Sequence, residues 1–375
     1  ITPDKAFAMA AISNNLIFVD LTTGAITSTV STGLVGDIEV SFDGQYAFVA
    51  NFNARVIDIA SQSLVRTITF ASCYDSAVSP TDYRVVALNN RFREDLHFYN
   101  INGASGFFEG FVPAGEPAEG DATFGVDISA DGFTVVACHI SSRNVAIIEL
   151  DNALATTYVD VGDRAREVRI TPDGAYAVVC AQDENEVVII DLDTKAVVKR
   201  LFISTRPSRV RISPDSQFAY VLNVAGSDRI TFIELDGANS SIVAQVSAGQ
   251  TGSANGYAYG EVSGIELSPD GSLLAVCDSF NDLVRIYDTA TFTQIDAVFV
   301  GDFPIRATFN ATGDRIYVTN SFDDSVVQLE ESGGSWSLIN GYSPIDFPLT
   351  VDVDAADEYV YVGNAGNDPA IRVFD

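Results

Sequence analysis

Lysine, histidine and long apolar runs are scarce in this sequence. Its 375 residues include three lysines (Lys5, Lys195 and Lys199) and two histidines (His97 and His139). The histidines are far apart and no HExxH or Cys-x-x-Cys pattern occurs, so we predict no zinc, haem or copper site and no cofactor. No run approaches the roughly 18 uninterrupted apolar residues of a membrane-spanning helix, so we do not expect membrane insertion.

Positive charge is also scarce. The chain has 51 acidic and 21 basic residues, which give a formal net charge of −30 and a pI near 4.1. Such a surface repels phosphate backbones, so nucleic acid is excluded as a partner. The acids are 36 Asp and 15 Glu, and the bases are 18 Arg and three Lys. This balance suits an extracellular, cell-surface or periplasmic protein. An equally good explanation is that Asp is a common turn residue, so a turn-rich fold would contain many of them.

The chain begins inside a repeat, at residues 1–4, without an initiator Met. We therefore expect that upstream residues were removed, trimmed or left out, and any export signal with them. We predict one domain over residues 1–375, and the alternative is a fragment of a longer surface protein. Four cysteines with no evident pairing argue against a location outside the cytoplasm.

Internal repeats dominate the sequence. A short turn recurs at residues 1–4, 41–44, 79–82, 129–132, 171–174, 213–216, 268–271, 310–313 and 354–357. From Asp131 to Asp173 to Asp215 the step is 42 residues twice. This period fits four short strands with their turns, which make one blade of a β-propeller.

The unit from residue 167 to 203 shows how a blade arises. We predict strands at 168–170, 176–180, 187–190 and 197–203, because these runs are apolar or β-branched and turn sequences separate them. The third-strand pattern recurs at 18–24, 56–62, 147–153, 232–238 and 285–291. No segment has a sustained 3.6-residue period, so we predict an all-β protein without a helix longer than about two turns.

The number of blades depends on the two ends of the chain. Seven complete units and two three-strand units, one at each end, give 34 strands, against 32 for eight blades and 36 for nine. The two terminal units overlap in two strands and cannot merge without displacing a pair. We therefore predict nine four-stranded antiparallel blade units, with an eight-bladed ring as the alternative.

Three second-strand segments carry a family resemblance. Asp314 to Asn320 reads DRIYVTN, and residues 219–223 and 47–51 read AYVLN and AFVAN. They resemble the Tyr-Val-Thr-Asn (YVTN) propeller repeat, and the resemblance covers essentially the whole chain. It implies a propeller of the kind found in prokaryotic surface-layer and secreted proteins and in lactonase-like enzymes. Several units depart from it, with Cys or Gly in place of Thr or Asn.

The cysteines follow the repeat. Cys138, Cys180 and Cys277 each lie six residues after a turn glycine, so they occupy equivalent places in three blades. Facing sheets are about 10 Å apart, beyond the reach of a disulfide, so we predict that these three thiols are reduced and buried. Cys73 has no obvious partner.

Polar side chains in turns have structural explanations. His139 falls at the end of a second strand and is interpreted as a polar strand-end residue. Acidic turns at 183–186, 323–324 and 364–368 could offer oxygen ligands to calcium, but none has the spacing of a calcium loop. Asx-capped hairpins explain them, and we predict no metal site.

Arginine is concentrated in one part of the repeat. The candidate ligand-binding arginines flank links from an outer strand to the next innermost strand, and they are Arg164, Arg166, Arg169, Arg206, Arg209, Arg211 and, in a later unit, Arg306. Guanidinium groups bind carboxylate, uronate or phosphate in bidentate fashion, so we predict an anion pocket. The alternative is ion pairing between blades with Asp163, Glu167, Asp173 and Asp215.

Two links of the same type are long. They span residues 112–125 and 246–264, and the second carries Tyr257 and Tyr259, which we add to the candidate ligand-binding residues. Long loops on a rigid scaffold often carry function. Trp336 is predicted to lie on an outer strand as a packing or edge residue.

These patterns favour a non-enzymatic, secreted or cell-surface module that binds a small anionic ligand or another surface protein. The alternative is a lactonase-like hydrolase, or another propeller enzyme, that acts on an anionic small molecule in the central channel. Such an enzyme needs a general base beside the arginines. Glu167, Glu261 and Asp127 are the available candidates, and no catalytic residue is assigned.

Overall fold

The computed structural model forms two compact units. Unit 1 comprises Ile1–Phe202 and Gly237–Asn239, and unit 2 comprises Ile203–Asp236 and Ser240–Asp375. The described residues are 7–12, 15–20, 23, 25–32, 37–50, 53–69, 73–89, 95–113, 123–139, 143–203, 205–224, 228–249, 264–353, 357, 359–364 and 371–374.

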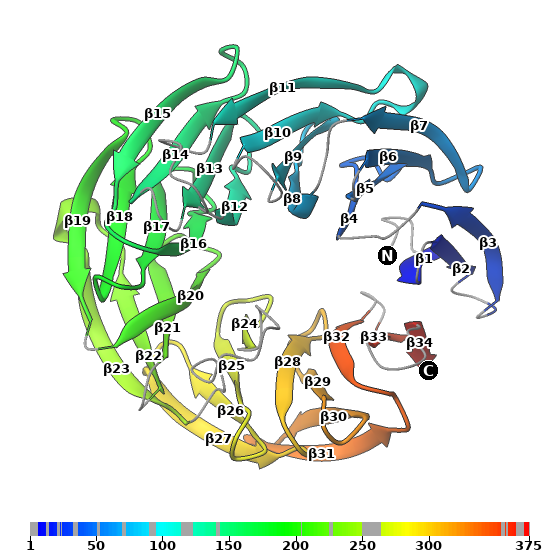
Figure 1. Cartoon of the computed structure of the whole chain (residues 1–375). Coiled ribbons are helices and arrows are strands. Elements are labelled where there is room, and N and C mark those ends of the chain that lie inside the picture. Colours follow the sequence, from blue (N-terminus) through cyan, green and yellow to red (C-terminus); the bar gives the residue numbers. More distant parts are fainter. Residues whose placement is uncertain are drawn as a thin grey trace. The chain divides into compact units, whose positions relative to one another are not determined.

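Unit 1 contains five antiparallel sheets, each built from consecutive strands (Figure 1). The first has three strands, β1 (Phe7–Ile12), β2 (Asn15–Asp20) and β3 (Ile26–Ser31). The other four have four strands each. They are β4 (Asp37–Val40), β5 (Tyr46–Ala50), β6 (Asn53–Asp58), β7 (Ser63–Thr69); β8 (Cys73–Val78), β9 (Arg84–Asn89), β10 (Asp95–Asn100), β11 (Phe107–Pro113); β12 (Thr123–Ile128), β13 (Thr134–His139), β14 (Asn144–Glu149), β15 (Ala155–Asp160); and β16 (Ala165–Ile170), β17 (Tyr176–Ala181), β18 (Glu186–Asp191), β19 (Ala196–Phe202).

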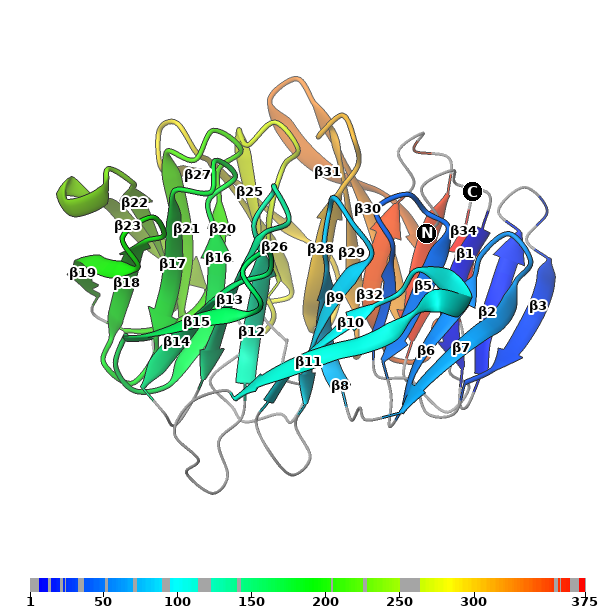
Figure 2. The same ribbon diagram turned by 90° about the horizontal axis from the view of Figure 1, so that it is seen from above.

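Unit 2 repeats this arrangement with three four-stranded sheets and a final three-stranded one. They are β20 (Arg206–Ile212), β21 (Phe218–Val224), β22 (Asp228–Glu234), β23 (Ser241–Gly249); β24 (Ile265–Leu267), β25 (Leu273–Asp278), β26 (Leu283–Asp288), β27 (Thr293–Phe299); β28 (Pro304–Phe309), β29 (Arg315–Asn320), β30 (Ser325–Ser332), β31 (Ser335–Tyr342); and β32 (Pro348–Val353), β33 (Val360–Asn364), β34 (Ile371–Phe374). Figure 2 shows the strands of one sheet running alongside each other, as in β16 to β18 of unit 1.

The predicted fold class is confirmed: the protein is an all-β propeller with four-stranded antiparallel blades. Its described strands make seven complete blades and a three-stranded sheet at each end of the chain. Eight blades are found, which is the number that the prediction gave as its alternative to nine. In the described residues the only helices are two three-residue 3-10 helices, η1 (Gly103–Ser105) and η2 (Gly237–Asn239). No described helix is long and apolar enough to span a membrane.

The blade formed by β16–β19 shows why the sequence adopts this fold. Its first turn is closed by Gly174, which has a φ of 74°. The Asp173 carboxylate accepts a hydrogen bond from the Thr171 hydroxyl at 2.6 Å and one from the Ala175 amide at 3.0 Å. The Thr171 hydroxyl in turn accepts a bond from the Tyr176 amide at 3.0 Å. The turn therefore sets the pairing of the first two strands before any packing between blades.

Aspartate closes a second kind of turn, at the end of the third strand. The Asp191 carboxylate accepts hydrogen bonds from the amide and the hydroxyl of Thr194, both at 2.7 Å. Asp58 and Asp288 hold equivalent turns with Ser61 and Thr291. The turn explanation for the abundance of Asp is therefore correct at these positions. The location outside the cytoplasm stays a prediction.

The core lies between neighbouring sheets within each unit. In unit 1, one cluster joins residues of the β12–β15 blade, such as Val136 and Ile147, to residues of the β16–β19 blade, such as Val179 and Val188. In unit 2, Trp336 belongs to the cluster between the β24–β27 and β28–β31 blades and packs edge-on against Phe309, with ring centroids 6.2 Å apart. The predicted place of Trp336 on an outer strand, as a packing residue, is correct.

Two glycines allow neighbouring blades to approach closely. A Cβ atom added to Gly125 would lie 3.1 Å from the Cα of Glu167, and one added to Gly264 would lie 3.1 Å from the Cα of Arg306. The same Cβ on Gly264 would lie 2.8 Å from the carbonyl oxygen of Ile305, a backbone atom that cannot easily move. Each glycine thus brings an innermost strand against that of the next blade.

Replacing Gly264 by Ala tests this contact. We expect Gly264→Ala to lower the free energy of unfolding by about 1–3 kcal/mol, because the new methyl group overpacks a backbone contact. Gly341→Ala is the matched control, since its Cβ would meet only Val327 at 3.8 Å. It should leave stability within about 1 kcal/mol of the wild type. Urea unfolding measures both, and equal stability of the two variants would contradict the expected contact.

The turn aspartates also predict the response to acid. Hydrogen bonds from neighbouring hydroxyl and amide groups lower the pKa values of Asp131 and Asp215 below 3.8. A carboxyl group whose pKa is lower in the folded state than in the unfolded state stabilises the fold at pH values above its unfolded pKa. This contribution is lost as the pH falls through the folded pKa. We expect the part of the stability that these turns supply to be lost below about pH 3.8, measured by urea unfolding from pH 7 to pH 2.5. In Asp215→Asn the loss should be smaller, and an identical pH profile for the two proteins would contradict this origin.

Candidate functional site

The candidate arginines are divided between the two units. Arg164, Arg166 and Arg169 belong to unit 1, and Arg206, Arg209, Arg211 and Arg306 belong to unit 2. Tyr257 and Tyr259 lie outside the described residues. Each unit therefore has its own set of candidate groups on its innermost strands.

In unit 1, Arg164 lies at the surface. It precedes β16, has a φ of 57°, and its guanidinium is 3.9 Å from the Asp183 carboxylate. The nearby Arg143 contacts Asp163 at 2.8 Å, with both side chains half exposed. Exposed pairs of this kind stabilise a fold little. The partner of Arg164 is thus an exposed carboxylate of its own blade, and not one of the four acidic residues named for ion pairing between blades.

Arg169 lies deeper, beside two carboxylates. Its guanidinium is 3.1 Å from an oxygen of Glu167, whose side chain is only 4% exposed. Asp127 reaches across from β12 and accepts a hydrogen bond from the Ile170 amide at 2.8 Å. It also accepts one from the Ile128 amide at 3.1 Å. Asp127, Glu167 and Arg169 thus make a charged cluster on two neighbouring innermost strands, which we call the unit 1 cluster.

The unit 1 cluster contains a carboxyl group that holds its proton more tightly than usual. Burial raises the pKa of Asp127, the charge of Arg169 opposes this, and the charge of Glu167 adds to it. A carboxyl group with a raised pKa beside an arginine is a candidate for exchanging a proton with a bound ligand. Cys138 is close by, but burial raises its pKa to about 12, so this thiol is a poor nucleophile.

In unit 2, β20 carries three arginines in seven residues. Arg206 is its first residue, and a bulge between Pro207 and Arg209 shifts its pairing with β21. Arg209 and Arg211 flank the buried Val210, so their side chains leave the same face of the strand. The Arg211 Nε is 3.5 Å from a carboxylate oxygen of Glu266 on β24. Arg211 therefore has a partner in the next blade.

Arg306 occupies the corresponding part of β28. Its side chain is half-buried, and its charge acts on the thiol of Cys277, although burial dominates and raises that pKa to about 12. The innermost strands of unit 2 together carry Arg206, Arg209, Arg211 and Arg306 against two carboxylates, Glu266 and Asp352. This local excess of positive charge stands within a chain whose net charge is −30.

The charged residues follow one repeat position, which the sequence shows for Arg169 and Arg211 and which Asp127 and Glu266 share. Asp127, Arg169, Arg211 and Glu266 each lie two residues before the Ser or Thr that begins the first turn of the blade. Alignment of the turns alone would have placed Asp127 and Glu266 with the arginines. Their mutual distances could not be obtained that way, since they depend on packing between blades.

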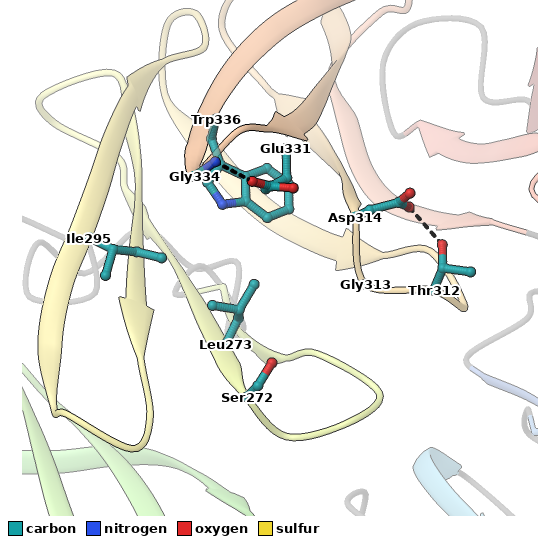
Figure 3. Close-up of a pocket in the computed structure, with 9 residues that line it drawn as sticks. All are labelled: Ser272, Leu273, Ile295, Thr312, Gly313, Asp314, Glu331, Gly334 and Trp336. Atoms are coloured by element: carbon teal, nitrogen blue, oxygen red, sulfur yellow. Dashed lines mark hydrogen bonds between the residues drawn. The ribbon is translucent and has the colours of Figure 1, made fainter.

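A separate hollow lies among the turns of unit 2. It has a volume of about 290 Å³ and is lined by Ser272, Leu273, Ile295, Thr312, Gly313, Asp314, Glu331, Gly334 and Trp336 (Figure 3). The Glu331 carboxylate accepts a hydrogen bond from the Gly334 amide at 2.6 Å, and the Asp314 carboxylate accepts one from the Thr312 hydroxyl at 2.6 Å. No arginine lines this hollow, so it does not supply the predicted anion pocket.

The histidines and cysteines lie where the repeat places them. His139 ends β13 and contacts the Asn144 side chain at 2.9 Å, as expected of a strand-end residue. Cys138, Cys180 and Cys277 are buried and free, which confirms the prediction for these thiols. The Cys73 side chain lies outside the described part of the structure. Within the described ranges, no group of three or more His, Cys, Asp or Glu could hold a metal ion.

Comparisons with known proteins agree with the fold, and one family model matches part of the chain. Residues 167–351 match the model of the family described as Lactonase, 7-bladed beta-propeller. This stretch includes Glu167 and Arg169 of unit 1 and the innermost strands β20, β24 and β28 of unit 2. No protein with a curated description matches the chain. The finer resemblance to the Tyr-Val-Thr-Asn repeat stays a prediction.

Solved structures of diverse proteins share the fold. The chain is similar to dihydro-heme d1 dehydrogenase NirN in complex with DHE, with a TM-score of 0.67 and 12% identity over 100% of this chain and 72% of that one. It is also similar to hydrazine synthase of Kuenenia stuttgartiensis, with a TM-score of 0.53 and 16% identity over 91% and 95% of the two chains. At these identities the likeness concerns the fold alone.

Proposed function

We propose that this protein is a non-enzymatic ligand-binding propeller that holds a small anionic molecule on the arginines of β20 and β28. The observation that carries the proposal is the run of three arginines on β20, in a protein of strongly negative net charge. A carboxylate, a uronate or a phosphate is the class of ligand that such a group recognises, because a planar guanidinium donates two parallel hydrogen bonds to it.

The local backbone favours Arg206 and Arg209 as the main ligand contacts. They flank Pro207, whose ring fixes its φ and stiffens the start of β20. A stiff strand presents the two side chains with less loss of conformational entropy on binding. Arg211 lies on the same strand, with its guanidinium 3.5 Å from the Glu266 carboxylate.

The same arginines could also receive an acidic side chain of another surface protein, in which case the propeller would serve as an assembly module. We keep a location outside the cytoplasm as part of the proposal, because an Asp-rich and Lys-poor surface suits it. The buried thiols are compatible with such a location, since reagents and oxidants reach buried thiols slowly.

A second candidate function is hydrolysis of a lactone, and the unit 1 cluster favours it. Asp127 combines a raised pKa with the nearby charge of Arg169, so it could take a proton from an attacking water molecule while Arg169 binds the substrate anion. The match of residues 167–351 to a lactonase family model supports the same function. This candidate depends on unit 1, whereas the binding site proposed first lies in unit 2.

Substitution of two arginines tests the binding function. In a thermal-shift screen with small carboxylates, uronates and phosphates, we expect at least one compound to raise the Tm of the wild type. Arg206→Gln with Arg209→Gln should remove that shift, because both bidentate donors are lost. The Tm without ligand should change little. Arg143→Gln, at an exposed ion pair of unit 1, is the control and should keep the shift. A lower Tm in the double variant with no ligand found would assign these arginines a structural role.

Substitution of Asp127 tests the hydrolytic alternative. The Ile128 and Ile170 amides donate to different oxygens of Asp127, so Asp127→Asn keeps one of these two hydrogen bonds and has no carboxylate to take up a proton. If the protein hydrolyses lactones, this change should lower kcat/KM by about 100-fold or more, as loss of a general base does. Acid release from a panel of lactones measures the rate. Wild-type activity at the level of the buffer blank would eliminate this function and leave the binding function.

A further inference from the structure

A row of four phenylalanines crosses two consecutive links and two consecutive turns of unit 2. Phe280 packs edge-on against Phe303 at 5.6 Å. Phe303 stacks on Phe322 with ring centroids 4.4 Å apart and planes 14° apart, and Phe322 lies 6.2 Å from Phe347. We call these four residues the phenylalanine row. Phe280 and Phe322 remain 42% and 49% exposed.

The backbone holds the phenylalanine row in place by repeated hydrogen bonds. The hydroxyls of Ser279 and Ser321 donate to the carbonyls of Pro304 and Pro348, each at 2.6 Å. The amide of Phe347 donates to the Asp324 carboxylate at 2.9 Å. The turns that follow β25 and β29 are thus tied to the links that precede the next innermost strands.

Two members of the row have an unusual backbone conformation. Phe303 and Phe347 have φ values of 60° and 52°. Such values are rare for bulky residues, and they persist only where the surrounding structure enforces them. The strained residues are thus Phe303, whose ring lies between those of Phe280 and Phe322, and Phe347, whose ring follows that of Phe322. Exposed aromatic groups on such an ordered backbone are typical of a binding surface.

Carboxylates accept hydrogen bonds from the backbone in and beside the phenylalanine row. The Asp302 amide donates to the Asp323 carboxylate at 2.9 Å, and the Phe303 amide donates to the Asp282 carboxylate at 3.2 Å. Asp302 is exposed, and slight desolvation together with the like charges of Asp282 and Asp323 raises its pKa. In the described part of the chain, no arginine or lysine forms an ion pair with these three carboxylates.

We propose that the phenylalanine row is a docking surface for a basic segment of another polypeptide, whose Arg or Lys side chains lie over the exposed rings of Phe280 and Phe322. A cation is attracted to the face of an aromatic ring, and the adjacent carboxylates add to the attraction. A neutral sugar would gain the ring contact but not the charge contact. The partner is therefore a cationic polypeptide, and this surface is distinct from the arginines of β20.

The experiment is a selection of random peptides on the immobilised full chain, with counter-selection on the Phe280→Ala, Phe322→Ala double variant. We expect the retained peptides to be enriched in Arg and Lys. The dissociation constant of one retained peptide should rise about tenfold or more in the double variant and several-fold in Asp302→Asn, Asp323→Asn. Phe299→Ala is the matched control, because Phe299 is 64% exposed in unit 2 but outside the row.

A milder pair of variants separates charge attraction from simple apolar contact. Phe280→Leu with Phe322→Leu keeps apolar bulk and should leave the Tm close to that of the wild type, yet it should weaken peptide binding about as much as the Ala variants. Retained peptides without basic residues, equal binding by the Leu variants and the wild type, or no peptides retained at all would overturn the proposal. So would row-dependent binding of neutral oligosaccharides in place of the peptides.

Discussion

Hydrogen bonds from backbone amides to aspartate carboxylates are the interactions on which the rest of this structure depends. They close the turn after the innermost strand of a blade, as at Asp173, and the turn after the third strand, as at Asp191. Each one fixes the length of a hairpin and therefore the register of its strands. Since one kind of bond recurs in blade after blade, the four-stranded sheet is a local product of each repeat.

These bonds also explain how a chain of net charge −30 folds. A carboxylate that accepts two or three hydrogen bonds is stabilised in its charged form, as the lowered pKa values of Asp215 and Asp288 show. Much of the negative charge therefore stabilises the turns. In so acidic a chain, a group of arginines marks a candidate binding site. The innermost strands of unit 2 carry such a group, which includes Arg206, Arg209 and Arg306.

The two units offer different chemistry on equivalent strands. In unit 1 the repeat position two residues before the turn holds Asp127 on β12 and Arg169 on β16, with Glu167 against the arginine. In unit 2 the same position holds Arg211 on β20 and Glu266 on β24, and the arginines are in excess. The phenylalanine row uses other parts of the blade, its turns and links, so a propeller can carry several sites without altering its sheets.

The sequence by itself determined the blade. The 42-residue step, the turn aspartates and the β-branched strands specify local hydrogen bonds and alternation, which is why the strands of β16–β19 and the equivalent places of Cys138 and Cys277 could be predicted. The unit to which each arginine belongs, the burial that raises the pKa of Asp127 and the stacking of Phe303 on Phe322 were decided only by the tertiary structure. These features depend on contacts between neighbouring blades, where close approach at residues such as Gly264 sets distances that no spacing along the chain encodes.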